Sequence, residues 1–251
     1  MNVKDNKKLF FLKLTVEHHP LFRDKVSFSV INDSRVNENN SDQLTHLFGS
    51  TWINNLITLV GKNATGKTTI MRLLIGMLNF LLEAQSIDQT QLKNVLIGNK
   101  PIKITTYFYG TDGFIYKDET SFKLKLPNRK WHVLEEKVYR KKVSKNISKR
   151  KLLVFDGRKP IIDRQDLDEI TASFVASDDS IFRSIIAKEK YAIQPIIDTL
   201  IFTNVNALFY DTENVPSEIL NYLDPTIEYL RVEKKNLRDE NGQMFFKLKF
   251  K

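Results

Sequence analysis

Residues 61–68 read Gly-Lys-Asn-Ala-Thr-Gly-Lys-Thr, which matches the pattern G-x-x-x-x-G-K-[ST] in full. The apolar run 56–60 comes directly before this pattern and is typical of a short buried strand. The stretch 70–82 follows it, is apolar nearly all round, and predicts a core helix. A strand, a glycine-containing turn and a buried helix in this order predict an α/β fold, because a layered sheet buries both flanking elements.

Residues 61–69 predict a phosphate-binding loop. The glycines let the loop curl so that successive backbone N–H groups point at phosphate oxygens, and the following helix adds its positive N-terminal end. Lys67 is the predicted catalytic charge on the β- and γ-phosphates, and the Thr68 hydroxyl is the predicted protein ligand of Mg²⁺. We therefore expect ATP with Mg²⁺ to be bound by Gly61, Lys62, Asn63, Ala64, Thr65, Gly66, Lys67, Thr68 and Thr69.

Composition narrows the class of protein further. The 251 residues contain no cysteine, which excludes structural disulfides and cysteine-ligated metal sites and suits a reducing cytosol. No stretch is long and apolar enough for a signal peptide or a membrane span, so we expect a cytoplasmic chain without a membrane partner. The formal net charge of +9 makes nucleic acid a natural candidate partner, although a lysine-rich surface that only maintains solubility has the same signature.

Hydrophobic patterning predicts one head built from several lobes: a phosphate-loop core lobe at 1–100, an antiparallel β subdomain at 101–160, a helical segment at 161–226 and a terminal hairpin at 227–251. In the first lobe, 9–16 and 25–31 are expected to pair as strands. In the second, the predicted strands are 102–109, 113–116, 121–126, 131–139 and 152–155. A helix is expected from 163 to about 202, and strands 227–233 and 244–250 flank the hairpin signal Asp-Glu-Asn-Gly.

The loop resembles that of ABC-type ATPases in the SMC, RecF and overcoming-lysogenization-defect branches, with Val60 before the pattern and Asn63 within it. The turn 21–24, Leu-Phe-Arg-Asp, is similar to the Asn-Phe-Arg/Lys-Ser turn that precedes their loop strand. The predicted antiparallel sheet follows the loop helix, as their lateral β subdomain does. Residues 223–228 and the closing hairpin look like the region before the signature motif in bacterial AAA-type ATPases of abortive infection and phage defence.

This resemblance implies a fold, a mechanism and partners. The fold would be a P-loop NTPase core with an antiparallel β subdomain and a helical segment. ATP would be sandwiched against the signature motif of a second protomer, so that binding drives dimerisation and hydrolysis releases it. Arg23 would touch a phosphate from the side, although a solvated turn arginine fits the same sequence. The ATPase would then drive an effector in antiviral defence or a DNA-maintenance complex.

Three motifs of the resembling class do not stand clearly in this sequence: the Leu-Ser-x-Gly signature, a Walker B strand ending in Asp-Glu, and the switch histidine. Two segments have the Walker B form of an apolar run followed by aspartate, namely 152–156 and 207–211, with Glu213 two places after the second. A strand that ends in a turn explains each of them, and we favour this interpretation. We therefore expect the second half of the head to lie on a longer parent chain or on a partner subunit.

Two further groups of residues suggest binding chemistry. Basic residues crowd the stretch 137–151 and could contact nucleic-acid phosphates, or form a solvated hairpin face. The pair His18-His19 beside Glu17 could suggest a metal, but adjacent strand residues point to opposite faces, and we expect a surface pair.

Two other functions fit the same loop. One is a domain that holds ATP without hydrolysis and scaffolds an effector. The other is a small-molecule P-loop kinase, which the β-rich stretch after residue 101 disfavours. A GTPase is disfavoured because Asn99-Lys100-Pro101-Ile102 lacks the aspartate that would read guanine.

Overall fold

The computed structural model describes residues 7–34, 36, 41–60, 66–144, 146–196, 226–234 and 244–250. The chain divides into two compact units, of which the first holds residues 1–60 and 66–196 and the second holds residues 61–65 and 197–251. The first unit contains a sheet with its helices, and the second contains a β-hairpin.

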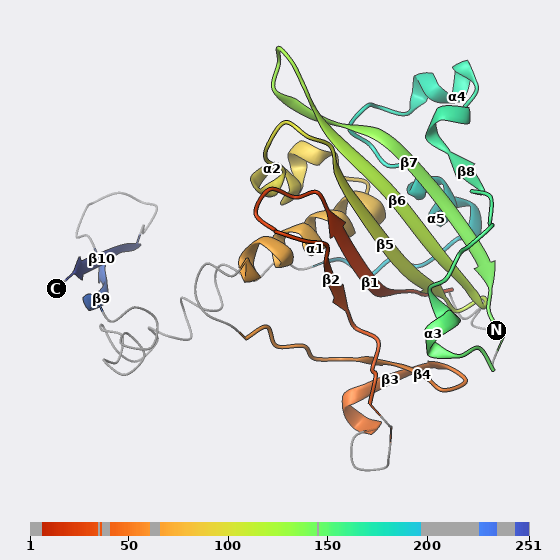
Figure 1. Ribbon diagram of the computed structural model, residues 1–251, viewed down its shortest axis with the longest axis horizontal. Coiled ribbons are helices and arrows are strands. Elements are labelled where there is room, and N and C mark those ends of the chain that lie inside the picture. The colour runs from red at the N-terminus through yellow and green to blue at the C-terminus, as the bar shows by residue number, and fades with distance from the viewer. Residues whose placement is uncertain are drawn as a thin grey trace, which may run out of the picture. The chain divides into compact units, whose positions relative to one another are not determined.

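A six-stranded sheet forms the centre of the first unit, and all of its neighbouring strands are antiparallel (Figure 1). Its order is β2-β1-β5-β6-β7-β8, so the chain leaves the sheet after β2 and returns beside β1 at β5. The end of the phosphate loop and its helix belong to this excursion. The strands are β1 (Leu9–Glu17), β2 (Val26–Ser29), β5 (Ile102–Gly110), β6 (Phe114–Lys125), β7 (Lys130–Lys142) and β8 (Ile162–Asp163).

Short elements surround this sheet. A small hairpin, β3 and β4, lies in the excursion before the loop, and helices α1 and α5 pack on one face of the sheet (Figure 1). The hairpin strands are β3 (Leu44–Phe48) and β4 (Thr51–Asn54). The helices are η1 (Ser41–Gln43), α1 (Lys67–Leu82), η2 (Ile87–Gln89), α2 (Leu92–Val95), α3 (Lys149–Leu152), η3 (Arg164–Asp166), α4 (Glu169–Phe174) and α5 (Phe182–Glu189).

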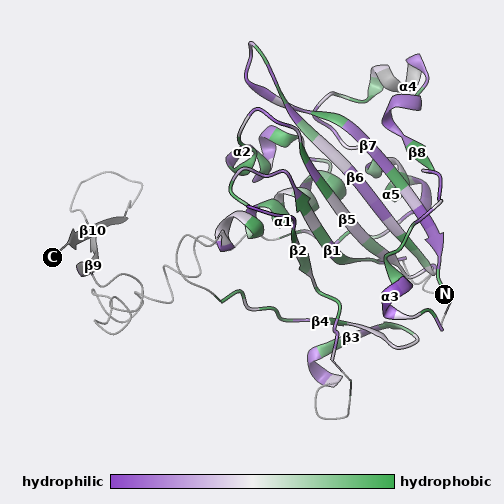
Figure 2. Cartoon of the chain, in the orientation of Figure 1, coloured by the Kyte–Doolittle hydropathy of each residue, from purple (hydrophilic) through white to green (hydrophobic). Residues whose placement is uncertain are grey.

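Helix α1 forms where the sequence predicts a core helix. It is hydrophobic over most of its length (Figure 2), and Leu73, Met77 and Phe80 are fully buried. These positions are spaced by four and three residues, which places them on one face of a helix. They pack against inward side chains of the sheet such as Phe108 and Phe122. Burial of this face holds the start of α1, and therefore the end of the phosphate loop, against the sheet.

A smaller hydrophobic cluster forms around other side chains of the same strands. Leu12, Tyr109 and Ile115 pack there with Phe48 from β3 and with Phe155 after α3. The register of β1 against β5 shifts between Phe11 and Lys13. A bulge of this kind changes the direction of a side chain, which explains why Leu12 and Leu14 lie in different clusters although they are two residues apart.

Most predicted strands are confirmed. Strands β1, β2, β5 and β7 lie where the alternation places them, and β1 pairs with β2 as expected. The predicted strands 113–116 and 121–126 are one continuous strand, β6, because the polar residues between them alternate in the same register. In the second unit, β9 (Ile227–Lys234) and β10 (Met244–Phe250) form the antiparallel hairpin that the turn signal predicts.

Three predicted elements are wrong. Residues 56–60 form no strand, and Leu56 and Val60 are 83% and 82% exposed, so this run is not a buried strand. Residues 152–155 are not a strand either, because Leu152 ends helix α3 and a turn follows. The long helix expected from 163 is instead β8, η3, α4 and α5, separated by non-helical segments, and residues 197–202 lie outside the described residues.

The fold is therefore mixed α/β with an antiparallel sheet. Strands of both predicted lobes, 1–100 and 101–160, share this one sheet.

Candidate nucleotide-binding site

Helix α1 begins with the last residues of the phosphate-loop pattern. Gly66 is its N-cap residue with φ 83° and ψ 9°, a left-handed conformation that glycine adopts without steric cost. Its carbonyl oxygen accepts the first helical bond from Ile70 N at 2.9 Å. In the part of the chain that the structure describes, no side chain caps this end, and the first turn holds no acidic residue that would offset the partial positive charge of the helix.

Three residues of the predicted site stand in the first turn of α1. The side chain of Thr68 is exposed, and those of Lys67 and Thr69 are partly buried. An exposed hydroxyl at this position is accessible to Mg²⁺ when phosphate is bound. Gly61, Lys62, Asn63, Ala64 and Thr65 lie outside the described residues.

The turn between β1 and β2 lies against the helix start. The ring of Phe22 contacts Gly66, and Phe22 N donates to the carbonyl oxygen of His19 at 3.0 Å. Arg23, the predicted side contact to phosphate, is exposed and comes directly after Phe22. The packing thus brings the turn that carries Arg23 next to Gly66, although more than forty residues separate them in sequence.

His19 fixes this turn and is not a surface residue. It is 2% exposed, its Nε2 lies 2.8 Å from Val95 O, and its Nδ1 accepts from Leu21 N at 3.3 Å. These partners assign the proton to Nε2. The expected surface pair is therefore wrong for His19 and holds for His18, which is exposed. The left-handed backbone of His18, with φ 62°, turns its neighbour inward.

The first of the two Walker B candidates, 152–156, does not end a strand. Asp156 lies in an exposed turn with Gly157, whose φ is 68°, and no strand precedes it. The second candidate, 207–211, and Glu213 lie outside the described residues, as does most of 223–228. Among the described residues, no group of three or more His, Cys, Asp or Glu side chains could hold a metal ion.

Four of the eight cations in the predicted basic cluster 137–151 make contacts within the chain. Lys137 pairs with Asp163 at 3.1 Å, and Arg140 pairs with Glu189 at 3.2 Å. Lys149 Nζ donates to the carbonyl oxygen of Asn32 at 2.6 Å.

Lys141 of the same cluster is buried under the segment that follows α3. Its Nζ donates to Lys151 O at 2.8 Å and to Val154 O at 2.7 Å, and it lies 4.8 Å from the ring centre of Phe155. Burial, with the charge of Arg158, lowers the pKa of Lys141 to about 8. This lysine is a structural anchor and does not belong to a binding surface.

A polar cluster in the core has no counterpart in the sequence-based prediction. Asp118 and Glu136 are fully buried on β6 and β7, and Thr120 donates to Asp118 Oδ1. Glu136 accepts bonds from the side chains of Ser180 and Arg164, the latter at 3.2 Å, and from the backbone N–H groups at the start of α5. The strict alternation Tyr116, Asp118, Thr120 could have revealed Asp118, because it places this carboxyl on the inward face.

The pKa of Asp118 is raised well above its usual value, first by burial and then by the charge of Glu136. Burial also raises the pKa of Glu136, while its hydrogen bonds and the charge of Arg164 act in the opposite direction. Asp118 Oδ2 has no donor partner among the described residues. A proton on Asp118 therefore removes the repulsion between the two carboxylates. Glu136 keeps its negative charge, which lies at the N-terminus of α5.

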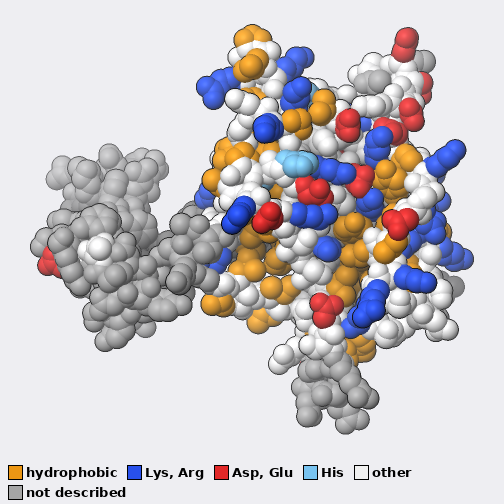
Figure 3. Space-filling model, viewed as in Figure 1, with side chains coloured by type: hydrophobic (Ala, Val, Ile, Leu, Met, Phe, Trp, Pro, Cys, Tyr) orange, Lys and Arg blue, Asp and Glu red, His pale blue; other side chains and the backbone are white. Residues whose placement is uncertain are grey.

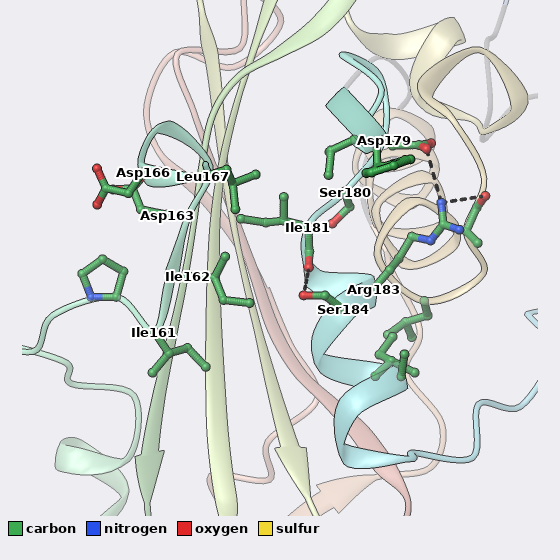
Figure 4. A pocket seen from close by; sticks show the side chains of 17 residues that line it. Ile161, Ile162, Asp163, Asp166, Leu167, Asp179, Ser180, Ile181, Arg183 and Ser184 are labelled. Atoms are coloured by element: carbon green, nitrogen blue, oxygen red, sulfur yellow. Dashed lines mark hydrogen bonds and ion pairs between the residues drawn. The ribbon is translucent and has the colours of Figure 1, made fainter. Parts of the chain in front are cut away.

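A cavity of about 880 Å³ lies between β8, the segment up to α4, and α5 (Figure 4). It reaches Leu82 and Ala84 at the C-terminal end of α1. Helix α1 has 16 residues, so this cavity lies roughly 20 Å along the helix from the phosphate-loop end. It is therefore not the nucleotide site. Two of its carboxylates, Asp163 and Asp179, pair with Lys137 and Arg183.

No protein family, curated protein or solved structure matches this chain. In the part of the chain that the structure describes, no helix is long and apolar enough to cross a membrane.

Proposed function

We propose that this chain binds ATP with Mg²⁺ at residues 61–69 and is the N-terminal part of an ABC-type ATPase head. The observation that carries the proposal is the position of the motif: its second glycine takes a left-handed conformation at the start of a buried 16-residue helix, with the motif lysine and threonine in the first turn. This is the geometry in which a helix N-terminus binds phosphate.

The residues have distinct roles in this proposal. Lys67 neutralises charge on the β- and γ-phosphates, and Thr68 gives Mg²⁺ its protein ligand. The backbone N–H groups at the start of α1 bind phosphate oxygens, and Arg23 reaches them from the neighbouring turn. Water activation requires a further carboxylate, which a second protomer or the rest of the head supplies.

The exposed run before the loop supports this incomplete-head proposal. Leu56 and Val60 are almost fully exposed, and Ile57 is 36% exposed. Apolar side chains in such a run gain free energy when another surface removes them from water. Strands that complete the sheet would cover them in a dimer or in a larger head. The effector would then be a defence or DNA-maintenance component that responds to dimerisation.

A non-hydrolysing ATP-binding scaffold is the second candidate. The position of Asp156 in an exposed turn favours it, because no other strand-end carboxylate of Walker B form lies in the described part of the chain. The two candidates differ in turnover and agree on binding.

The test measures Mg·ATP binding by isothermal titration and ATP turnover as a function of protein concentration. Lys67→Ala and Thr68→Ala should abolish binding or weaken it at least tenfold, and Lys93→Ala, which removes an exposed cation of α2, should not. Turnover that rises faster than linearly with concentration supports a self-assembling ATPase. Binding without turnover supports the scaffold, and equal binding by Lys67→Ala and wild type would refute both.

A further inference from the structure

The end of the β6–β7 hairpin extends beyond the rest of the sheet. Strand β5 pairs with β6 only as far as Phe122, and β8 pairs with β7 only at residues 137 and 138. Residues 123–132 therefore form a two-stranded ribbon with no described strand beside it, visible as the projecting loop of the sheet in Figure 1. We call these residues the ribbon.

The ribbon is strongly basic. Between residues 120 and 134 the sequence has four cations and no acidic residue. All four are exposed, and none has an ion-pair partner within the residues that the structure describes. Figure 3 shows Lys and Arg side chains beside the hydrophobic end of this projection. The four are Lys123, Lys125, Arg129 and Lys130.

The charges are concentrated on one face. Lys125 lies opposite Lys130 in the register, and Lys123 lies opposite His132. Residues two apart on a strand share a face, so Lys123, Lys125 and Lys130 point to the same side of the ribbon, and Arg129 lies in the turn beside Lys130. Like charges directly opposite each other destabilise a hairpin. The same field contributes to the lowered pKa of His132, after burial. Such an arrangement is favourable when an external polyanion supplies the missing negative charge.

The shape of the ribbon distinguishes among polyanions. Its paired part is roughly 10 Å long, which matches the depth of about 8.5 Å of the major groove of B-form DNA, and a two-stranded ribbon fits the groove's width. The major groove of duplex RNA is too narrow for it. Single strands bind by stacking bases on exposed aromatic side chains, but Trp131, the one Phe, Tyr or Trp among 123–132, packs against the core. Leu126, which is 73% exposed, is the large hydrophobic side chain at the tip of the ribbon.

We propose that the ribbon is a docking site for double-stranded DNA, with the four cations on phosphates and Leu126 at the base edges. This site is separate from the ATP site, and it replaces the cluster 137–151 as the nucleic-acid surface. Four phosphate contacts predict a slope of about −3.6 for the logarithm of the association constant against the logarithm of salt concentration. Binding should thus weaken roughly 100-fold between 50 and 200 mM salt.

The test uses the full chain without nucleotide and a fluorescein-labelled 20-base-pair DNA duplex of mixed sequence, followed by anisotropy. The ribbon variant carries Lys123→Gln, Lys125→Gln, Arg129→Gln and Lys130→Gln. The control variant removes equal charge from other exposed cations through Lys142→Gln, Arg150→Gln, Lys151→Gln and Lys159→Gln. Circular dichroism and thermal unfolding verify that both variants fold.

The ribbon variant should bind at least tenfold more weakly at 50 mM salt and lose most of the salt slope, whereas the control should bind within threefold of wild type. Lys67→Ala should bind DNA as wild type does, because the ribbon does not depend on the ATP site. The ATP proposal can therefore fail without affecting the DNA proposal. Equal weakening of the two charge variants would overturn the proposal. Tighter binding of an RNA duplex, or binding through the ribbon to vesicles of phosphatidylserine and phosphatidylcholine but not to DNA, would overturn it as well.

Discussion

The ring of Phe22 lies so close to Gly66 that a Cβ atom on residue 66 would stand 2.7 Å from Phe22 Cε1. Two segments that are distant in sequence, the β1–β2 turn and the start of α1, therefore meet at a position where only glycine fits. The contact involves an aromatic ring that His19 also holds, with the two ring centres 5.0 Å apart. The ring has little freedom to move away from an added methyl group.

Gly66→Ala should therefore destabilise the protein and weaken ATP binding. The substitution has two costs: about 1 kcal/mol for a non-glycine residue at φ 83°, and the clash with Phe22. We expect a total of about 2–3 kcal/mol in the free energy of unfolding, measured with urea, and at least a tenfold loss of Mg·ATP affinity.

Gly113→Ala is the matched control for this substitution. Gly113 has φ 84°, and a Cβ atom there would meet nothing within 4 Å. Gly113→Ala should lose only the roughly 1 kcal/mol that a non-glycine residue costs at this φ, and it should bind ATP as wild type does. The double variant Gly66→Ala with Phe22→Ala should regain part of the stability lost by Gly66→Ala. Equal unfolding free energies for the two single glycine variants would show that the Phe22 contact is soft.

Asp118→Asn should gain stability relative to wild type as the pH rises. Burial and Glu136 raise the folded-state pKa of Asp118, so its contribution to stability is complete below its unfolded pKa near 3.8 and declines toward the folded pKa. The amide imitates the protonated acid and does not titrate. The variant should gain on wild type by up to about 1.4 kcal/mol for each pH unit above 4, until the folded pKa is reached.

Urea unfolding of wild type and Asp118→Asn between pH 4 and 8 measures this difference. Asp156→Asn, which replaces an exposed carboxylate by an amide, is the control for the substitution itself. If the unfolding free energy of Asp118→Asn does not rise relative to that of wild type as the pH rises, then Asp118 is ionised in the folded protein.

Local patterns predicted much of the fold, and contacts between distant segments account for what they missed. Period-two alternation located β1, β5, β6 and β7, and an apolar stretch located α1, because each pattern is set by one buried face. The run 56–60 has the composition of a buried strand, but no described strand pairs with it in this sheet. The segment after 163 was predicted as one helix because its apolar residues recur, yet Asp163 pairs with β7 as part of strand β8, and α4 and α5 are separate helices.

The candidate site shows the same division. The motif predicted the positions of Gly66, Lys67 and Thr68, since its spacing alone defines a loop followed by a helix. The contact between Phe22 and Gly66 could not be derived from the sequence, because it depends on how the β1–β2 turn packs. The charge cluster 137–151 was overestimated for a similar reason: Asp163, Glu189 and Asn32, which bind its side chains, come from other elements.

Lys141→Met should destabilise the protein by an amount that grows in alkaline solution. The folded-state pKa of Lys141 is about 8, below its usual 10.5, so between these values the unfolded chain holds a proton that the folded chain has lost. Wild-type stability therefore gains from Lys141 as the pH rises from 8 to 10.5, a gain that methionine cannot provide.

At pH 7 the variant should lose about 1 kcal/mol, because the carbonyl groups of Lys151 and Val154 lose their donor. Urea unfolding at pH 7, 8, 9 and 10 measures the gap, with Lys142→Met at the exposed neighbouring position as the control for replacing a lysine by methionine. A gap for Lys141→Met that is constant across this range would show that the buried amine keeps an ordinary pKa.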